Sequence, residues 1–164
     1  MNLAPSPLQL ERYFVSELSI QANKRFKPDQ PIMLGMDDVV MEPRFMPIAN
    51  KARGWEVVLR IFHQGANGIN TPYFFSIELV AFFGVHKSYG AEKSEWLVRT
   101  NASSVLYTMA REILRNAMSH GPFMPLILPT VTFYTKEVQD SLKQVKAGTP
   151  TTRRRAARTP KGKK

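Results

Sequence analysis

The 164-residue sequence has no cysteine, which excludes a disulfide framework, a thiolate nucleophile and a cysteine-ligated metal. It also lacks an apolar run of the roughly 18 residues that a membrane-spanning helix needs. The most apolar segment, 73–85, has 13 residues and contains Ser76 and Glu78. Residues 1–7 lack the charged and apolar regions of a secretory signal. From these absences we expect a cytoplasmic protein without membrane insertion.

Acidic residues are also few. The sequence has 13 Asp and Glu and 23 Lys and Arg, so its net charge is +10. Residues 149–164 hold seven of the cations and no carboxylate, which leaves +3 for residues 1–148. This tail has no large apolar side chain to bury, so we expect it to be disordered beside one folded domain. It would attract nucleic acid or the ribosome by neutralising phosphates, although a solubilising tail without a partner is an equally good interpretation. The cations of the tail are Arg153, Arg154, Arg155, Arg158, Lys161, Lys163 and Lys164.

Alternating apolar residues predict the strands of an antiparallel sheet. The even positions of 8–22 are mostly apolar, which predicts one long strand with a single buried face. Ile32, Leu34 and Met36 alternate in the same way before two aspartates and predict a weaker second strand.

Two further apolar segments flank a turn rich in glycine and asparagine at 65–68. The segment 57–61 alternates and the segment 73–83 follows the turn, so we expect an antiparallel hairpin. The second segment is apolar at odd and at even positions, which predicts a cover over both of its faces.

A long helix is predicted next, with Asn101 as its N-cap and an end at His120 before Gly121 and Pro122. Its apolar residues occupy much more than one stripe. A small sheet buries only one side of such a helix, so we expect helices sandwiched between the sheets of different subunits. A shorter and more polar helix is expected over 135–145.

Residue patterns that would indicate an enzyme or a metal site are missing. The three histidines have no carboxylate at a spacing that suggests a catalytic triad or a metal site, and no glycine-rich phosphate loop occurs. Asp37 and Asp38 are neighbours, so on an extended chain they would point to opposite faces. We therefore expect no enzymatic activity, no metal and no cofactor. The ten Phe and eight Met residues are suited to hydrophobic binding of low specificity. For any single one of these residues, however, a place in the hydrophobic core is the better explanation.

Several segments, in the same order along the chain, resemble the SecB family of protein-export chaperones. The most specific are Leu106–Ile113 on the long helix and the Gly-Pro-Phe turn at 121–123, where Met124 departs from the family pattern by preceding Pro125. Trp55–Arg60 resembles the third strand of the family, and the segment 10–22 resembles the first.

This resemblance implies an α+β fold in which a four-stranded antiparallel sheet packs with a long helix and a shorter C-terminal helix. It implies a chaperone domain at 1–148 that assembles as a homotetramer, a dimer of dimers. The implied function is an ATP-independent holdase that keeps unfolded precursor proteins competent for Sec-dependent export and passes them to SecA. Two alternatives stay open: a chaperone dedicated to one partner such as an antitoxin, and a nucleic-acid-binding protein acting through the basic tail.

The resemblance also implies roles for single residues. Ile32, Leu34 and Met36 match the strand that lines the client groove, and Val138 and Leu142 match the last helix loosely. For SecA, Glu17 matches one acidic contact. Gln21 and Ser76 stand where further carboxylates are expected, and the basic tail replaces the usual acidic one.

Overall fold

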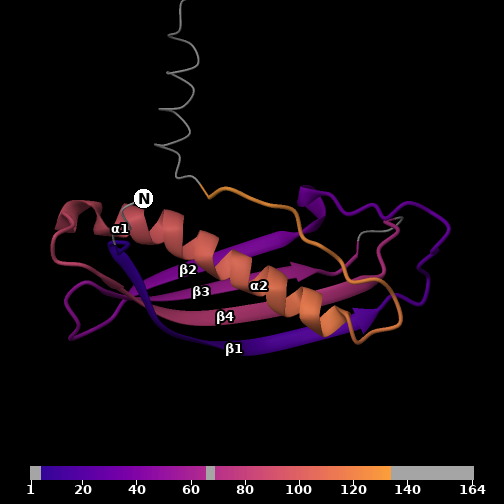
Figure 1. Ribbon diagram of the computed structural model, residues 1–164, viewed down its shortest axis with the longest axis horizontal. Helices are drawn as coiled ribbons and strands as arrows, with labels where there is room; N and C mark the ends of the chain where they lie inside the picture. Colours follow the sequence, from indigo (N-terminus) through magenta and orange to yellow (C-terminus); the bar gives the residue numbers. More distant parts are fainter. Residues whose placement is uncertain (1–4, 66–68, 134–164) are drawn as a thin grey trace, which may run out of the picture. The chain divides into compact units, whose positions relative to one another are not determined.

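The computed structural model describes residues 5–65 and 69–133. Within them, four antiparallel strands form one sheet in the order β1-β4-β3-β2, and a long helix lies along one face of it (Figure 1). The strands are β1 (Leu8–Ala22), β2 (Val40–Pro47), β3 (Gly54–His63) and β4 (Tyr73–Val85). The helical elements are η1 (Met36–Asp38), η2 (Ala91–Lys93), α1 (Ser94–Leu97), η3 (Val98–Ala102) and α2 (Ser103–Met118). The predicted α+β sheet with a long helix is confirmed, and the helix predicted at 135–145 lies outside the described residues.

The hydrophobic core lies between α2 and the two central strands. The β3–β4 hairpin, confirmed as predicted, aligns Leu59 with Leu79 and Ile61 with Ile77, and these four side chains are fully buried. Residues 66–68 of its predicted turn lie outside the described part of the chain. The α2 side chains buried against the sheet recur at steps of three and four, as one face of a helix requires. They are Ser103, Leu106, Tyr107, Ala110, Leu114 and Met118.

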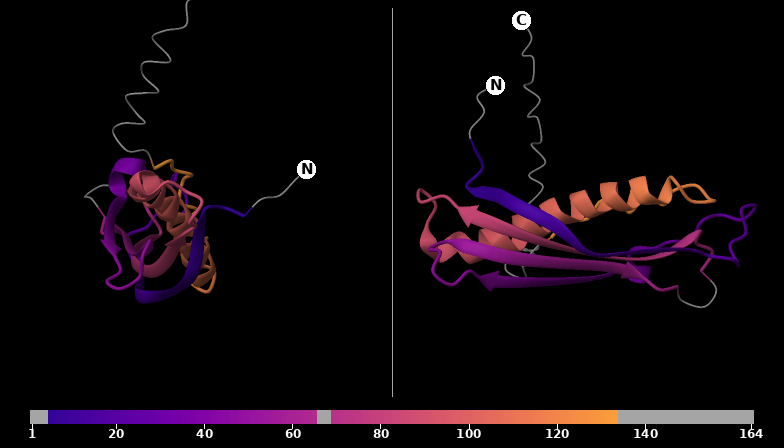
Figure 2. Two further views of the ribbon diagram at one scale, coloured as in Figure 1. Left: turned by 90° about the vertical axis from the view of Figure 1, so that its left-hand side faces the viewer. Right: turned by 90° about the horizontal axis from the view of Figure 1, so that it is seen from below.

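The opposite face of the sheet, called here the outer face, has no second layer in the described residues (Figure 2). Phe74, Ser76, Glu78 and Phe82 of β4 point to this face and are half-buried. The sequence predicts a cover over both faces of 73–83, and the described part of the chain supplies only one of them.

β1 is one strand over the predicted residues. The prediction that its even positions form a single buried face is wrong. Its pairing with β4 shifts register at Glu11 and again at Ser16, so two bulges divide the strand. After the first bulge the odd residues of β1 point to the helix side in place of the even ones. After the second bulge the even residues point to the helix side again. Between them Tyr13 points to the helix side and Phe14 to the outer face, the reverse of the simple alternation.

The second strand lies later in the chain than the alternation at 32, 34 and 36 predicts, so that prediction is wrong. Residues 32–35 are irregular, Met36 begins η1, and β2 starts at Val40. β2 is an edge strand that contains Pro43 and Pro47. Proline has no N–H for a ladder bond, so it is tolerated where a strand has only one neighbour. Its prolines make this strand hard to recognise from sequence.

The long helical segment begins earlier than predicted. It starts with α1 at Ser94, whose hydroxyl donates to Gly90 O at 3.1 Å, and passes through the π-helical η3 into α2. Asn101 therefore lies inside the helical segment, and its prediction as an N-cap is wrong. The predicted end is confirmed, because α2 stops at Met118 and Gly121 N donates to Met118 O at 3.0 Å. None of the described helices is long and apolar enough to cross a membrane.

After α2 the chain turns back along a second side of the helix (Figure 1). In this returning segment, residues 122–133, Leu126 and Leu128 are buried in the core. Tyr107 of α2 donates its hydroxyl hydrogen to Pro129 O at 2.7 Å. Burial raises the pKa of the Tyr107 phenol above its usual value, an effect that the positive charge of Arg111 partly offsets.

Candidate binding groove

The predicted groove residues Ile32 and Leu34 lie in the crossover segment, residues 24–39, which connects β1 with β2. Ile32 is 47% exposed, whereas Leu34 is half-buried and packs against the core. The backbone of Met36 begins η1, and its side chain is not among the described parts. Val138 and Leu142 lie outside the described residues. Of the predicted set, the structure therefore brings together Ile32 and Leu34.

Two hollows meet at Ile32, and together they form what we call the crossover groove. The first has a volume of about 420 Å³ and the second about 470 Å³. Residues that line the first are Phe26, Pro28, Ile32, Pro72, Pro122, Phe123 and Met124. Those that line the second are Ile32, Met33, Leu34, Gly35, Asp38 and Ile69. The groove thus combines the crossover segment, the start of β4 and the turn after α2.

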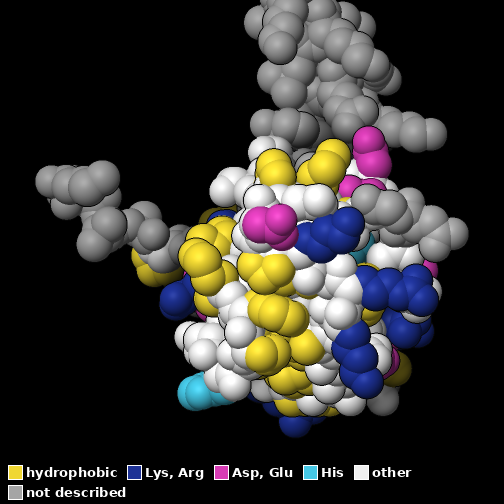
Figure 3. Space-filling model, turned by 90° about the vertical axis from the view of Figure 1, so that its right-hand side faces the viewer, with side chains coloured by type: hydrophobic (Ala, Val, Ile, Leu, Met, Phe, Trp, Pro, Cys, Tyr) yellow, Lys and Arg dark blue, Asp and Glu magenta, His cyan; other side chains and the backbone are white. Residues whose placement is uncertain are grey.

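Apart from Asp38, the side chains that line the groove are apolar, and the groove is open to solvent. Met33 is 64% exposed and Met124 is 80% exposed, in addition to the half-exposed Ile32. Figure 3, which faces this end of the molecule, shows hydrophobic side chains gathered in a band. Exposed apolar surface in a continuous patch marks a binding site far more often than scattered apolar residues do. Flexible methionines adapt to partners of different shape.

Tyr73 holds one wall of the groove in place. Its buried hydroxyl donates to Phe123 O at 2.7 Å and accepts from Phe123 N at 2.9 Å. The Phe123 ring then meets the Phe26 ring edge-on, with centroids 5.0 Å apart. Gly121 makes room for this arrangement, because a Cβ there would lie 2.5 Å from Tyr73 Oη.

The crossover segment is fixed by side chains from the end of β3 and from the loop before β4. Asn70 Nδ2 donates to three carbonyl oxygens of residues 27–31, at 3.0 to 3.3 Å, and Asn70 Oδ1 accepts from Lys27 N at 3.0 Å. His63 Nδ1 lies 2.9 Å from Asp38 O, and His63 Nε2 lies 3.2 Å from Thr71 Oγ1. A carbonyl oxygen only accepts, so in the neutral ring Nδ1 carries the hydrogen and Nε2 accepts from the threonine. The groove therefore has an anchored backbone and exposed side chains.

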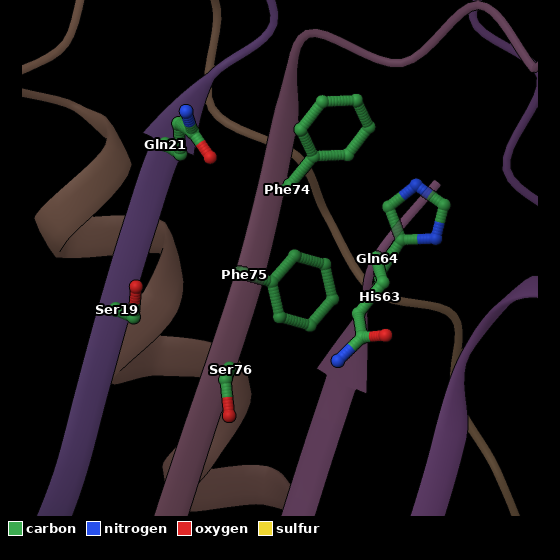
Figure 4. A pocket seen from close by; sticks show the side chains of 7 residues that line it. All are labelled: Ser19, Gln21, His63, Gln64, Phe74, Phe75 and Ser76. Carbon is green, nitrogen blue, oxygen red and sulfur yellow. The ribbon is translucent and has the colours of Figure 1, made fainter. Parts of the chain in front are cut away.

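A third hollow, of about 220 Å³, contains His63 but no carboxylate (Figure 4). The imidazole lies near the rings of Phe74 and Phe75, with centroids 5.9 and 6.0 Å away. The side chain is almost completely buried, and both nitrogens have the partners given above. His63 is therefore a structural histidine. The residues lining this hollow are Ser19, Gln21, His63, Gln64, Phe74, Phe75 and Ser76.

Glu17 lies on the outer face in a row of charged side chains that crosses all four strands. The register places it opposite Glu78, which in turn lies opposite Arg60. Glu17 Oε2 is 3.8 Å from an Arg60 nitrogen, and Glu78 Oε2 is 3.1 Å from an Arg44 nitrogen. The sequence reasoning missed Glu78 because only the strand register shows that it shares a face with Glu17. Both carboxylates are partly neutralised by arginine.

One side of α2 stays uncovered by the sheet and by the returning segment. Val105 is 38% exposed, and Met109 and Ile113 follow it at steps of four and are half-buried. On the helix side of β1, Tyr13 and Leu18 are also exposed. The breadth of apolar residues on the helix predicts such a surface, and no described residue covers it.

Comparison with known proteins gives one family match and a similar fold. The family model for SecB, preprotein translocase subunit SecB, matches residues 3–141. A SecB-like chaperone of Mycobacterium tuberculosis, solved in complex with a peptide from an antitoxin, is 16% identical with a TM-score of 0.54, over 76% of this chain and 88% of that one. A Streptococcus agalactiae protein of unknown function is 13% identical with a TM-score of 0.40, over 78% of this chain and 97% of that one. None of the curated proteins matches the sequence.

Proposed function

Because this chain belongs to the SecB family, we propose that it is an ATP-independent holdase that binds unfolded proteins in the crossover groove. The observation that carries the proposal is the groove itself: an apolar, open lining on a backbone anchored by Asn70, His63 and Tyr73. An anchored backbone keeps the apolar side chains from collapsing into the core. The proposed activity is binding alone and needs no catalytic residue and no cofactor.

The apolar area that a client buries on binding supports a preference for unfolded chains. A client that buries roughly 1,000 Å² of apolar surface gains about 25 kcal/mol before any cost is subtracted. Ordering the client consumes most of this gain, so the net affinity is much smaller than the gross value. A folded protein keeps its apolar residues inside and offers no such area. The groove would therefore distinguish unfolded from folded proteins without reading a sequence motif.

We further propose that the active form is a homotetramer, a dimer of dimers. The uncovered side of α2 around Val105 and the helix side of β1 around Tyr13 supply the apolar surfaces that this assembly would bury. A monomer that leaves both surfaces in water would be prone to nonspecific association. A second copy of the chain is the partner that covers them in our proposal.

For the destination of the clients, we propose delivery of precursor proteins to SecA in the cytoplasm, with Glu17 as a contact. The alternative, a chaperone dedicated to one partner such as an antitoxin, is favoured by the ion pairs of the outer face. Glu17 and Glu78 are engaged by Arg60 and Arg44, so a basic partner would have to displace an arginine from each carboxylate. The basic tail would be accessory, attracting nucleic acid or ribosomes without taking part in client binding.

An aggregation assay tests the proposed function. A chemically unfolded client is diluted with and without the full-length protein, in the absence of ATP, and light scattering is followed while the solution mass of the protein is recorded. We expect delayed aggregation by a species of about four chain masses. A protein that leaves the aggregation rate unchanged at a severalfold excess would contradict the holdase proposal, and suppression by a monomer would contradict the tetramer alone.

A further inference from the structure

The crossover segment alternates cationic and apolar residues at one end of the groove. Phe26 and Pro28 line the first hollow, whereas Lys24, Arg25 and Lys27 are exposed. Among the described residues, none of these three cations forms a salt bridge, while most other arginines of the sheet and helix do. The chain that borders the first hollow therefore carries three exposed cations without an ion pair in the described part of the molecule.

The crossover segment also carries three carboxylates, all of which follow the three cations in the chain. Asp37 and Asp38 lie in η1 beside the second hollow, and Asp38 Oδ2 already accepts from Gly35 N at 2.7 Å. Only Asp29 follows the three cations closely in the chain. Figure 3 shows lysine and arginine side chains beside the hydrophobic band at this end of the molecule, with some aspartate and glutamate side chains among them.

We propose that the crossover groove selects unfolded segments in which acidic residues flank the apolar anchors. The anchors would occupy the first hollow, and the flanking carboxylates would lie along the rim formed by Lys24, Arg25 and Lys27. This inference rests on the proposed function, because it names the class of client that the same groove takes.

Charge complementarity is the physical basis of the selection. Charged groups at the rim of an interface steer the approach of an oppositely charged partner and repel one of the same sign. The apolar lining has no sequence preference of its own, so the rim charge decides between segments with equal anchors. Solvent-exposed pairs are screened by salt, with a Debye length of about 8 Å at physiological ionic strength. The preference should therefore weaken as salt is raised, while binding through the anchors persists.

Three fluorescent peptides test the proposal with the full-length protein. They share one central anchor of leucine and phenylalanine and differ only in the flanks, which hold three Glu, three Ser or three Lys. We expect the Glu-flanked peptide to bind about tenfold more tightly than the Lys-flanked one at low salt, since each of several exposed ion pairs contributes a small amount. The Ser-flanked peptide should lie between them.

A charge-reversal variant and a matched control assign the effect to the rim. Lys24→Glu/Lys27→Glu reverses two charges beside the groove. The control, Lys87→Glu/Lys93→Glu, reverses two exposed lysines from the connection between β4 and α1 and changes the net charge equally. We expect the first variant to lose or invert the preference and the control to keep it.

The outcomes separate this inference from the proposed function. Equal affinity of the wild-type protein for all three peptides would overturn the acidic preference and leave the holdase intact. Equal loss of preference in both variants would overturn the rim as its source, because net charge would then be sufficient. Failure of every peptide to bind would overturn the groove and the proposed function together.

Discussion

Ile32→Asp should abolish most client binding while leaving the fold and the assembly intact. Ile32 is the residue shared by the two hollows, and it is 47% exposed in a segment without regular structure. A substitution at an exposed position of this kind changes the free energy of unfolding by no more than about 0.5 kcal/mol. Leu34 is a poorer choice because it packs against the core, so a charge there would destabilise the fold as well.

The expected loss of affinity follows from the exposure of Ile32. Full burial of an isoleucine side chain contributes about 1.5–3 kcal/mol, so a client that covers the exposed half gains about 1 kcal/mol from it. An aspartate at this place would instead lose its hydration beneath the client, at a further cost of about 1–3 kcal/mol. The two effects total at least about 2 kcal/mol, which corresponds to a Kd raised by at least about thirtyfold.

Met46→Asp is the matched control for this prediction. Met46 is 42% exposed, close to the value for Ile32, but it lies on the outer face of β2 away from the groove. The Kd for a permanently unfolded, fluorescently labelled client is measured for both variants, together with solution mass and thermal unfolding. If Ile32→Asp binds as tightly as the wild type, or if Met46→Asp weakens binding to the same extent, the groove assignment is refuted.

Four further results are expected. Tyr73→Phe leaves the half-buried Phe123 N–H without its acceptor, so the free energy of unfolding should drop by about 1 kcal/mol in urea titrations, with weaker client binding. Stability should fall as the pH rises above about 10, because the raised pKa of Tyr107 keeps a proton in the folded chain that the unfolded chain releases; Tyr107→Phe should flatten this part of the profile. Val105→Asp should split the proposed tetramer in light-scattering measurements without unfolding the subunit, since Val105 is 38% exposed in the single chain. Deletion of residues 149–164 should remove salt-sensitive binding of nucleic acid in a gel-shift assay and leave the client Kd unchanged.

The central strands and the end of the long helix were predictable because their signals are local. The alternation around Leu59 matches a strand buried on one side by a helix, and the Gly121-Pro122 pair stops a helix wherever it occurs. Neither feature depends on a partner far away in the chain. The family resemblance drew on the same segments.

Two of the errors arose where strand pairing decides the outcome. The bulges at Glu11 and Ser16 depend on the register with β4. Because the second bulge reverses the effect of the first, both ends of the strand keep the same alternation of apolar residues and the sequence shows no break. The edge position that tolerates Pro43 and Pro47 in β2 is likewise a property of the sheet. No local pattern reports either feature.

Part of the groove escaped prediction for a similar reason. Ile32 was identified through its apolar alternation, although the segment proved to be irregular instead of a strand. Phe26 and Met124 belong to the groove only because Tyr73 brings the turn after α2 next to the crossover segment. A phenylalanine between cations in a polar loop was the one available signal, since an aromatic residue has no reason to be in a solvated loop unless it packs or binds.

Photo-crosslinking from the groove shows whether unfolded clients bind there. A photoreactive amino acid is placed at Ile32 in one protein and at Met46 in another, and each is irradiated with one client in its unfolded and in its folded state. We expect strong crosslinks from position 32 to the unfolded client alone, and few from position 46 to either form. Equal crosslinking from both positions, or equal crosslinking of folded and unfolded client from position 32, would contradict it.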